Sequence, residues 1–129
     1  MKRIIIHWTA GTGKASQLDK KQYHFLIEDD GAVVRGDHDP LANHFISRPS
    51  DSSTYAAHTA KLNTGSIGIA LCGMRGAKQK PFNHGPSPLT QTQIDKLVSF
   101  TAGLCHDYGI PVTRETVLTH AEVQPTLQV

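Results

Sequence analysis

Residues 66–73 read Ser-Ile-Gly-Ile-Ala-Leu-Cys-Gly, a run of small and apolar side chains without a charged residue. A strand with one solvent-facing side alternates polar and apolar residues, whereas a strand covered on both sides is apolar throughout. This segment is therefore typical of a central strand in a sheet with helices on both faces. We predict an α/β fold, built on a single mixed β-sheet flanked by helices.

Shorter runs predict the strands around this one. Arg3 to Thr9 contains three consecutive isoleucines and a tryptophan, and it leads into a glycine-containing loop. Residues 23–27 and 32–36 flank the turn sequence Asp29-Asp30-Gly31, which predicts an antiparallel hairpin. A last short strand is predicted over residues 117–120.

One long helix is predicted from its N-cap Thr90 to Tyr108, with Gly109 as its left-handed stop. Its apolar residues recur with the period of a helix: Ile94, Leu97, Val98, Leu104, Cys105 and Tyr108. A helical turn capped by Ser16 is predicted over residues 16–22. Residues 37–61 show no period, so they predict a long loop of the kind that is usually functional, and residues 74–88 predict a second polar loop.

Length and charge exclude several classes of protein. The 129 residues predict a single domain, 1–129. A net charge of +2 without a run of like charges gives no reason to expect a nucleic-acid partner.

Met1-Lys2-Arg3 precedes only three isoleucines, too few for a signal peptide, and no apolar run is long enough for membrane insertion. We expect a cytoplasmic monomer in which Cys72 and Cys105 are buried free thiols.

Histidine is the feature of the composition that points to chemistry, with eight residues against four phenylalanines. His7 and His120 each stand at the end of a predicted strand, where open α/β sheets bind ligands. Two neutral imidazoles on rigid elements suit zinc, although either could be a structural histidine. His24 is interpreted as structural, and Asp37-His38-Asp39-Pro40 as a turn rather than a metal cluster.

Four segments carry a resemblance to a known family, and they occur in the family's order. They are residues 4–10 (IIIHWTA), 23–31 (YHFLIEDDG), 57–63 (AHTAKLN) with 66–69 (SIGI), and 118–123 (LTHAEV). Together they resemble the zinc-dependent N-acetylmuramoyl-L-alanine amidases, the family that includes phage lysozyme-type amidases and peptidoglycan recognition proteins. The resemblance covers nearly the whole chain.

The resemblance implies hydrolysis of the amide between N-acetylmuramic acid and the L-alanine of the stem peptide, by water activated on zinc held by His7 and His120. Tyr23 matches a tyrosine that orients this water or stabilises the oxyanion, the alternative being a packed strand tyrosine. His58 and Asn63 match a loop that binds substrate, the alternative being that they face solvent. Peptidoglycan or a muropeptide is the expected partner.

The family's third zinc ligand is a cysteine or aspartate at least about ten residues after the second histidine, with a lysine two residues before it. The nearest positions here, 126–128, read Thr-Leu-Gln. Because zinc hydrolases use three protein ligands, we expect the third ligand beyond Val129, in an amidase domain that this sequence truncates at its C-terminus.

Three functions stay open at this point. The leading hypothesis is a bacteriolytic phage or prophage endolysin, which accumulates in the cytoplasm and is then released to the cell wall. The second is a cytoplasmic amidase that recycles muropeptides. Some such members carry a glutamate where this chain has Ala70, and that difference favours a mechanism through Tyr23. The third is a non-catalytic peptidoglycan-binding module, which an incomplete zinc site would suit.

Overall fold

The computed structural model describes residues 1–46 and 51–129, and its centre is a five-stranded sheet in the order β3-β2-β4-β1-β7. The strands are β1 (Arg3–Trp8), β2 (Phe25–Ile27), β3 (Val33–Arg35), β4 (Ser66–Leu71) and β7 (Val117–Thr119). Strands β1, β2, β4 and β7 are parallel to one another, and β3 pairs antiparallel with β2. The predicted mixed α/β sheet is therefore confirmed, with β4 fully buried inside it.

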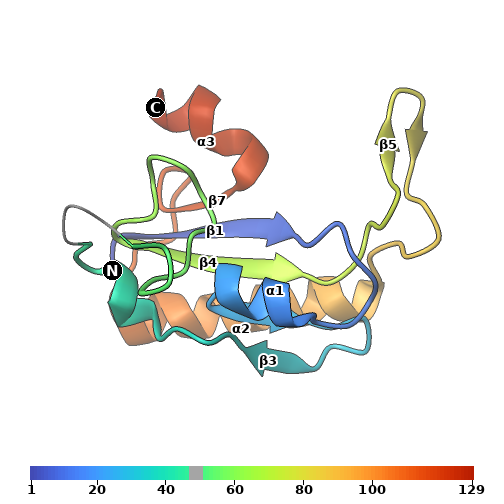
Figure 1. Cartoon of the computed structure of the whole chain (residues 1–129). Helices are drawn as coiled ribbons and strands as arrows, with labels where there is room; N and C mark the ends of the chain where they lie inside the picture. The colour runs from blue at the N-terminus through green and yellow to red at the C-terminus, as the bar shows by residue number, and fades with distance from the viewer. Residues whose placement is uncertain (47–50) are drawn as a thin grey trace.

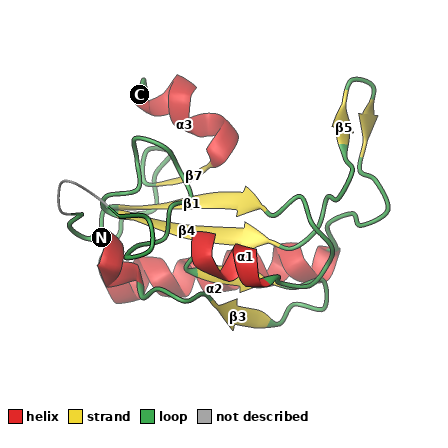
Figure 2. Ribbon diagram, in the orientation of Figure 1, coloured by secondary structure: helices red, strands yellow, loops and turns green. Residues whose placement is uncertain are grey.

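Helices lie on both faces of this sheet. The long helix α2 (Gln91–Tyr108) runs along one face, and α3 (His120–Leu127) stands on the opposite side, as Figures 1 and 2 show. The short helix α1 (Gln17–Gln22) precedes β2, and a 3₁₀ turn, η1 (Pro40–Asn43), follows β3. None of the helices in residues 1–46 and 51–129 has the length and apolar character needed to cross a membrane.

Side chains alternate along β1, so its residues pack on both faces of the sheet. Ile4 belongs to the larger core, where Ile67, Ile69 and other strand residues pack with Leu104 of α2. Ile5 points the other way and packs with Leu118 and with Val123 of α3. Because side chains alternate along a strand, His7 shares the α3 side with Ile5.

The apolar stripe predicted for α2 is partly wrong. Ile94 and Val98 are exposed, at 36% and 67%, and Phe100, which the prediction left out, packs on the core. The helix instead turns the line of Gln93, Leu97, Phe100 and Leu104 toward the sheet. The reason is that Gln93 is itself fully buried and hydrogen-bonded to the ends of two strands, which fixes the rotation of the helix.

The 3₁₀ turn η1, helix α3 and a hairpin within residues 74–88 were not predicted. The last strand, predicted over residues 117–120, ends at Thr119, and helix α3 begins at His120. This helix includes Pro125, a residue that disfavours a helix interior, and only Val123 in it is buried. Its N-terminus is stabilised by Glu122, whose carboxylate accepts hydrogen bonds from the backbone and hydroxyl of Thr119. The predicted loop 74–88 contains a small exposed hairpin of β5 (Lys78–Gln79) and β6 (Phe82–Asn83).

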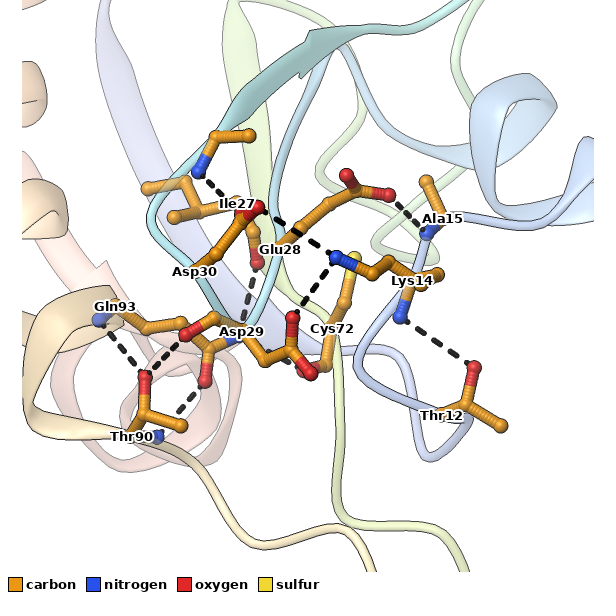
Figure 3. Close-up of polar contacts among 11 residues, drawn as sticks. Thr12, Lys14, Ala15, Ile27, Glu28, Asp29, Asp30, Cys72, Thr90 and Gln93 are labelled. Atoms are coloured by element: carbon orange, nitrogen blue, oxygen red, sulfur yellow. Dashed lines mark hydrogen bonds and ion pairs between the residues drawn. The ribbon is translucent and has the colours of Figure 1, made fainter.

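Polar contacts hold the start of α2 against the sheet (Figure 3). The side-chain amide of Gln93 donates to the carbonyl oxygens of Ile27 and Cys72, at 2.9 and 2.8 Å. The hydroxyl of Thr90 donates to the carbonyl oxygen of Asp29 at 2.7 Å. The N-terminal end of the helix is thereby tied to the ends of β2 and β4. Cys72 is also a buried free thiol, as expected, and burial raises its pKa to about 12.

A second buried network anchors the long loop that follows β3. His24 is 1% exposed; its Nδ1 accepts from the backbone N–H of Gly68, and its Nε2 donates to Asn43 Oδ1. The amide of Asn43 donates in turn to the carbonyl oxygens of Ala56 and Asn63. Both ring nitrogens of His24 therefore act within the fold, in agreement with its interpretation as a structural residue.

Replacing Gln93 by Met tests the link between α2 and the strand ends. The variant keeps a similar volume but leaves two buried carbonyl groups without their donor. We expect the free energy of unfolding to fall by about 2–3 kcal/mol in urea titrations. Gln91→Met, on the exposed side of the same helix, is the control and should change stability by less than about 0.5 kcal/mol. Equal effects of the two variants would contradict the proposed link.

The neutral state of His24 predicts a loss of stability in acid. Burial lowers the pKa of His24 to about 4, whereas an unfolded histidine titrates near its ordinary value. As pH falls below that ordinary value the unfolded chain takes up a proton that the folded chain does not, so stability is lost. We expect His24 to contribute about 2 kcal/mol of loss between pH 7 and pH 5. His24→Gln should weaken this dependence and the exposed-site control His106→Gln should not; equal profiles would contradict the assignment.

Candidate active site

Parallel pairing of β1 with β7 brings two histidines together that are far apart in the sequence. Ile4, Ile5 and Ile6 lie opposite Val117, Leu118 and Thr119. The next residue along each segment is a histidine, His7 on β1 and His120 at the start of α3. The centroids of their rings are 5.1 Å apart. The structure therefore places the two predicted metal ligands side by side at the C-terminal edge of the sheet.

Tyr23 joins this pair from the other side of His7. It caps the C-terminus of α1 just before β2, and its ring centroid lies 5.2 Å from that of His7. The ring packs on the small cluster of Leu26, Ala70 and Cys72. Burial, followed by the charge of Asp19, raises the pKa of the Tyr23 hydroxyl, so this group stays protonated at neutral pH. Tyr23 thus combines a packed ring with a hydroxyl group able to donate near His7.

Ala70 is the residue of β4 that lies opposite His7 on one side and Leu26 of β2 on the other. It is fully buried and its methyl group lies in the cluster that supports Tyr23. No acid or base is available from this position. Among the residues described around this position, Tyr23 is the one that brings a hydroxyl group close to His7.

His58 lies beneath His7 rather than at the surface of the long loop. Its Nδ1 is 3.2 Å from His7 Nε2 and 2.8 Å from Thr59 Oγ1, and its Nε2 is 3.2 Å from the carbonyl oxygen of Ser66. The ring covers Gly68 so closely that a Cβ at that position would come within 2.6 Å of it. Both ring nitrogens thus have partners within the fold, and the predicted contact of His58 with substrate stays a prediction.

Asn63 shapes the turn that carries His58. Its Oδ1 accepts hydrogen bonds from the backbone N–H groups of His58 and Thr59, at 3.0 and 2.8 Å. This oxygen therefore holds residues 58–63 in shape, and the predicted contact of Asn63 with substrate stays a prediction. His58 and Asn63, the two predicted substrate-binding residues, therefore both make hydrogen bonds within the fold: His58 through its two ring nitrogens and Asn63 through Oδ1.

Burial favours the neutral form of the two inner histidines, His7 and His58. Burial, together with smaller effects of the nearby His58 and His120, lowers the pKa of His7 to about 3. Burial likewise lowers the pKa of His58 to about 3. A neutral imidazole is the form that binds a metal, so the environment of His7 fits a metal ligand.

The donor set fits zinc in part. His7 and His120 supply the imidazole nitrogens that zinc prefers, but hydrolytic zinc sites use three protein ligands. Within residues 1–46 and 51–129, no group of three His, Cys, Asp or Glu side chains is placed to hold a metal ion. The predicted third ligand beyond Val129 stays a prediction. Asp39, from the sequence interpreted as a turn, caps η1 and pairs with Arg35, in agreement with that interpretation.

Two residues around the site were not singled out from the sequence. Thr59 is 3% exposed and contacts both His7 and His58, yet in the sequence it is one of two threonines in the aperiodic segment 37–61. Gly68 did carry a signal, because a glycine inside an otherwise β-branched strand often marks a close approach of another group. That group is the ring of His58, which the sequence alone could not indicate.

Comparison with known proteins gives one family match. The chain matches the family model for N-acetylmuramoyl-L-alanine amidase over residues 1–128. A search of curated proteins gave no match.

Among solved structures, the N-acetylmuramoyl-L-alanine amidase LysC from Clostridium intestinale URNW superposes with a TM-score of 0.62 at 21% identity, covering 97% of this chain and 73% of that one. The amidase AmiD from E. coli gives 0.64 at 20% identity, covering 95% of this chain and 49% of that one. Drosophila peptidoglycan recognition protein SD gives 0.59 at 21% identity, covering 98% and 72%.

At these identities the structural likeness shows a shared fold. The family match extends over all but the last residue of the chain, and it includes both histidines at the strand ends. The chain belongs to the N-acetylmuramoyl-L-alanine amidase family.

Proposed function

We propose that this protein is a peptidoglycan amidase that hydrolyses the bond between N-acetylmuramic acid and the L-alanine of the stem peptide, with zinc as its metal. The observation that carries the proposal is the juxtaposition of His7 and His120, with Tyr23 against His7. Family membership gives the reaction class, and this geometry supplies two nitrogen ligands and one protonated hydroxyl group.

His7 and His120 are the residues that would hold the metal. His7 is 9% exposed and fixed on β1, whereas His120 is exposed at the first position of α3. When bound, zinc supplies Lewis acidity that polarises a carbonyl oxygen and makes water a better nucleophile. The buried ligand gives the site a fixed position in the fold, and the exposed ligand leaves it open to solvent and substrate.

Tyr23 supplies the hydrogen-bond donor in this proposal. Attack on the amide carbonyl places negative charge on its oxygen, and a donor held close to that oxygen lowers the barrier. The raised pKa keeps the proton on the hydroxyl at neutral pH, and the packing of the ring on Ala70 and Leu26 limits its movement. Tyr23 therefore acts as a donor to the oxyanion or to the attacking water.

A phage or prophage endolysin is the biological setting that we favour. Solved structures with this fold include an endolysin amidase, LysCS, from C. intestinale URNW and the endolysin of Thermus bacteriophage Ph2119. In this setting the protein would act as a monomer, stay in the cytoplasm until its release, and then lyse the cell wall. Ala70 weighs against the muropeptide-recycling alternative, because a glutamate at that place is absent.

A non-catalytic peptidoglycan-binding module is the second candidate function. It is favoured by one observation, the two-histidine donor set within the described residues. The peptidoglycan recognition proteins LCa and LCx, solved as an ectodomain complex with tracheal cytotoxin, include a chain of the same fold. Release of stem peptides from purified peptidoglycan separates the two functions, since a binding module would sediment with the walls but release nothing.

The metal site predicts that zinc binding depends on both strand-end histidines. In isothermal titration of the metal-free chain with Zn²⁺, His7→Ala and His120→Ala should each lower the affinity at least about tenfold, because each removes one of few ligands. His106→Ala, on the exposed side of α2, is the matched control and should leave the affinity unchanged. An unchanged affinity in either site variant would overturn the assignment.

The role of Tyr23 predicts a loss of rate without a loss of fold. Tyr23→Phe removes only the hydroxyl, so we expect peptidoglycan hydrolysis to fall roughly 10²–10³-fold, as when one oxyanion donor is removed. Tyr108→Phe, on the α2 side of the sheet, is the control and should keep the parent rate. If Tyr23→Phe retains more than about half of that rate, the residue only packs.

A further inference from the structure

Three polar atoms lie within hydrogen-bond distance of one another on the inner side of His7. They are His7 Nε2, His58 Nδ1 and Thr59 Oγ1. The distances are 3.2 Å between the two ring nitrogens, 2.8 Å from His58 Nδ1 to Thr59 Oγ1, and 3.3 Å from Thr59 Oγ1 to His7 Nε2. Thr59 is 3% exposed and His7 is 9% exposed, so these atoms must satisfy one another. The positions of their protons are therefore constrained.

The carbonyl oxygen of Ser66 determines which nitrogen of His58 carries the proton. Its Nε2 lies 3.2 Å from the carbonyl oxygen of Ser66, and a carbonyl oxygen can only accept. Nε2 therefore carries the proton of the neutral ring, and Nδ1 has none. His58 Nδ1 thus faces His7 and Thr59 as an acceptor.

Only one tautomer of His7, the one with a proton on Nε2, gives all three atoms a hydrogen-bond partner. If His7 Nε2 carries a proton, it donates either to Thr59 Oγ1, whose hydroxyl then donates to His58 Nδ1, or directly to His58 Nδ1. If His7 Nε2 carries no proton, two nitrogen lone pairs face each other at 3.2 Å, and a single hydroxyl must serve both. A buried acceptor without a donor is costly, so the Nε2–H form of His7 is favoured.

We propose that His58 and Thr59 are positioning residues that hold His7 as its Nε2–H tautomer, so that Nδ1 is the nitrogen that His7 presents to a metal. The inference rests on the proposed metal site. A histidine that binds a metal commonly donates its other ring N–H to a neighbouring group, which fixes both the tautomer and the direction of the ring. Here that neighbouring group is a His58–Thr59 acceptor pair.

The surroundings of His58 show why the pair is rigid. The ring lies over Gly68 of β4, where any Cβ would collide with it, and it meets the ring of His24 edge-on at 5.6 Å. The backbone N–H groups of His58 and Thr59 both donate to Asn63 Oδ1. The acceptor pair is thereby fixed to β4, the same strand that aligns His7 by backbone pairing.

Two substitutions of His58 separate the roles of its nitrogens. In His58→Asn the amide oxygen replaces Nδ1, so an acceptor toward His7 is kept. In His58→Gln the amide group reaches the place of Nε2, so the contact to Ser66 is kept and the acceptor toward His7 is lost. Thr59→Val removes the hydroxyl at nearly constant volume and tests the second member of the pair.

The first measurement is the tautomer of His7 in the metal-free chain, read from long-range ¹H–¹⁵N correlation spectra. We expect the Nε2–H tautomer in the parent protein and in His58→Asn, and a mixture of tautomers in His58→Gln. An Nδ1–H tautomer of His7 in the parent protein would overturn the inference. This result does not depend on zinc, so it stands apart from any failure of the proposed metal site.

The second measurement is the affinity for Zn²⁺. Loss of such a partner typically weakens metal binding about 10–100-fold, and we expect this effect in His58→Gln. His58→Asn should stay within about threefold of the parent, the rescue that a merely structural role would not give. Equal weakening in both variants would overturn the inference. If His58→Gln does not fold, Thr59→Val takes its place, and the spectrum of the parent protein still decides the tautomer.

Discussion

The parallel pairing of β1 with its two neighbours is the constraint on which the rest of this molecule depends. Backbone hydrogen bonds set the register, with His7 opposite Ala70 of β4 and one step beyond the last pair of β7, where His120 follows. Because side chains alternate along a strand, the same register that packs Ile4 on α2 and Ile5 on α3 turns His7 toward the α3 side. A shift of one residue would place His7 in the α2 core and remove the site.

The two faces of the sheet have different roles. The face covered by α2 holds the larger apolar core, and Gln93 adds polar ties between that helix and the strand ends (Figure 3). The other face holds a smaller apolar cluster under α3, and beside it the histidines and Tyr23. Stability therefore comes mainly from one face, and the other can carry neutral, polar and partly exposed groups.

The long loop after β3 is ordered by hydrogen bonds more than by apolar packing. Asn43 and His24 join the described parts of this loop to β4, and Asn63 closes the turn that carries His58. Gly68 then admits the ring of His58 against the strand. In such a network each polar group has a specific partner, so the network specifies one geometry around His7 in a way that an apolar contact would not.

The sequence by itself determined the elements whose residues repeat with a regular period or carry turn chemistry. The strands near residues 3–8, 25–27, 33–35 and 66–71, the long helix, and the free cysteines all follow from local composition. It missed α3, since Pro125 argues against a helix and little of this helix is buried. Tertiary structure alone decided which strands pair, and with that the contact of His7 with His120 and Tyr23. It also decided the inward position of His58, because a contact across more than fifty residues depends on backbone pairing and packing that no local pattern records.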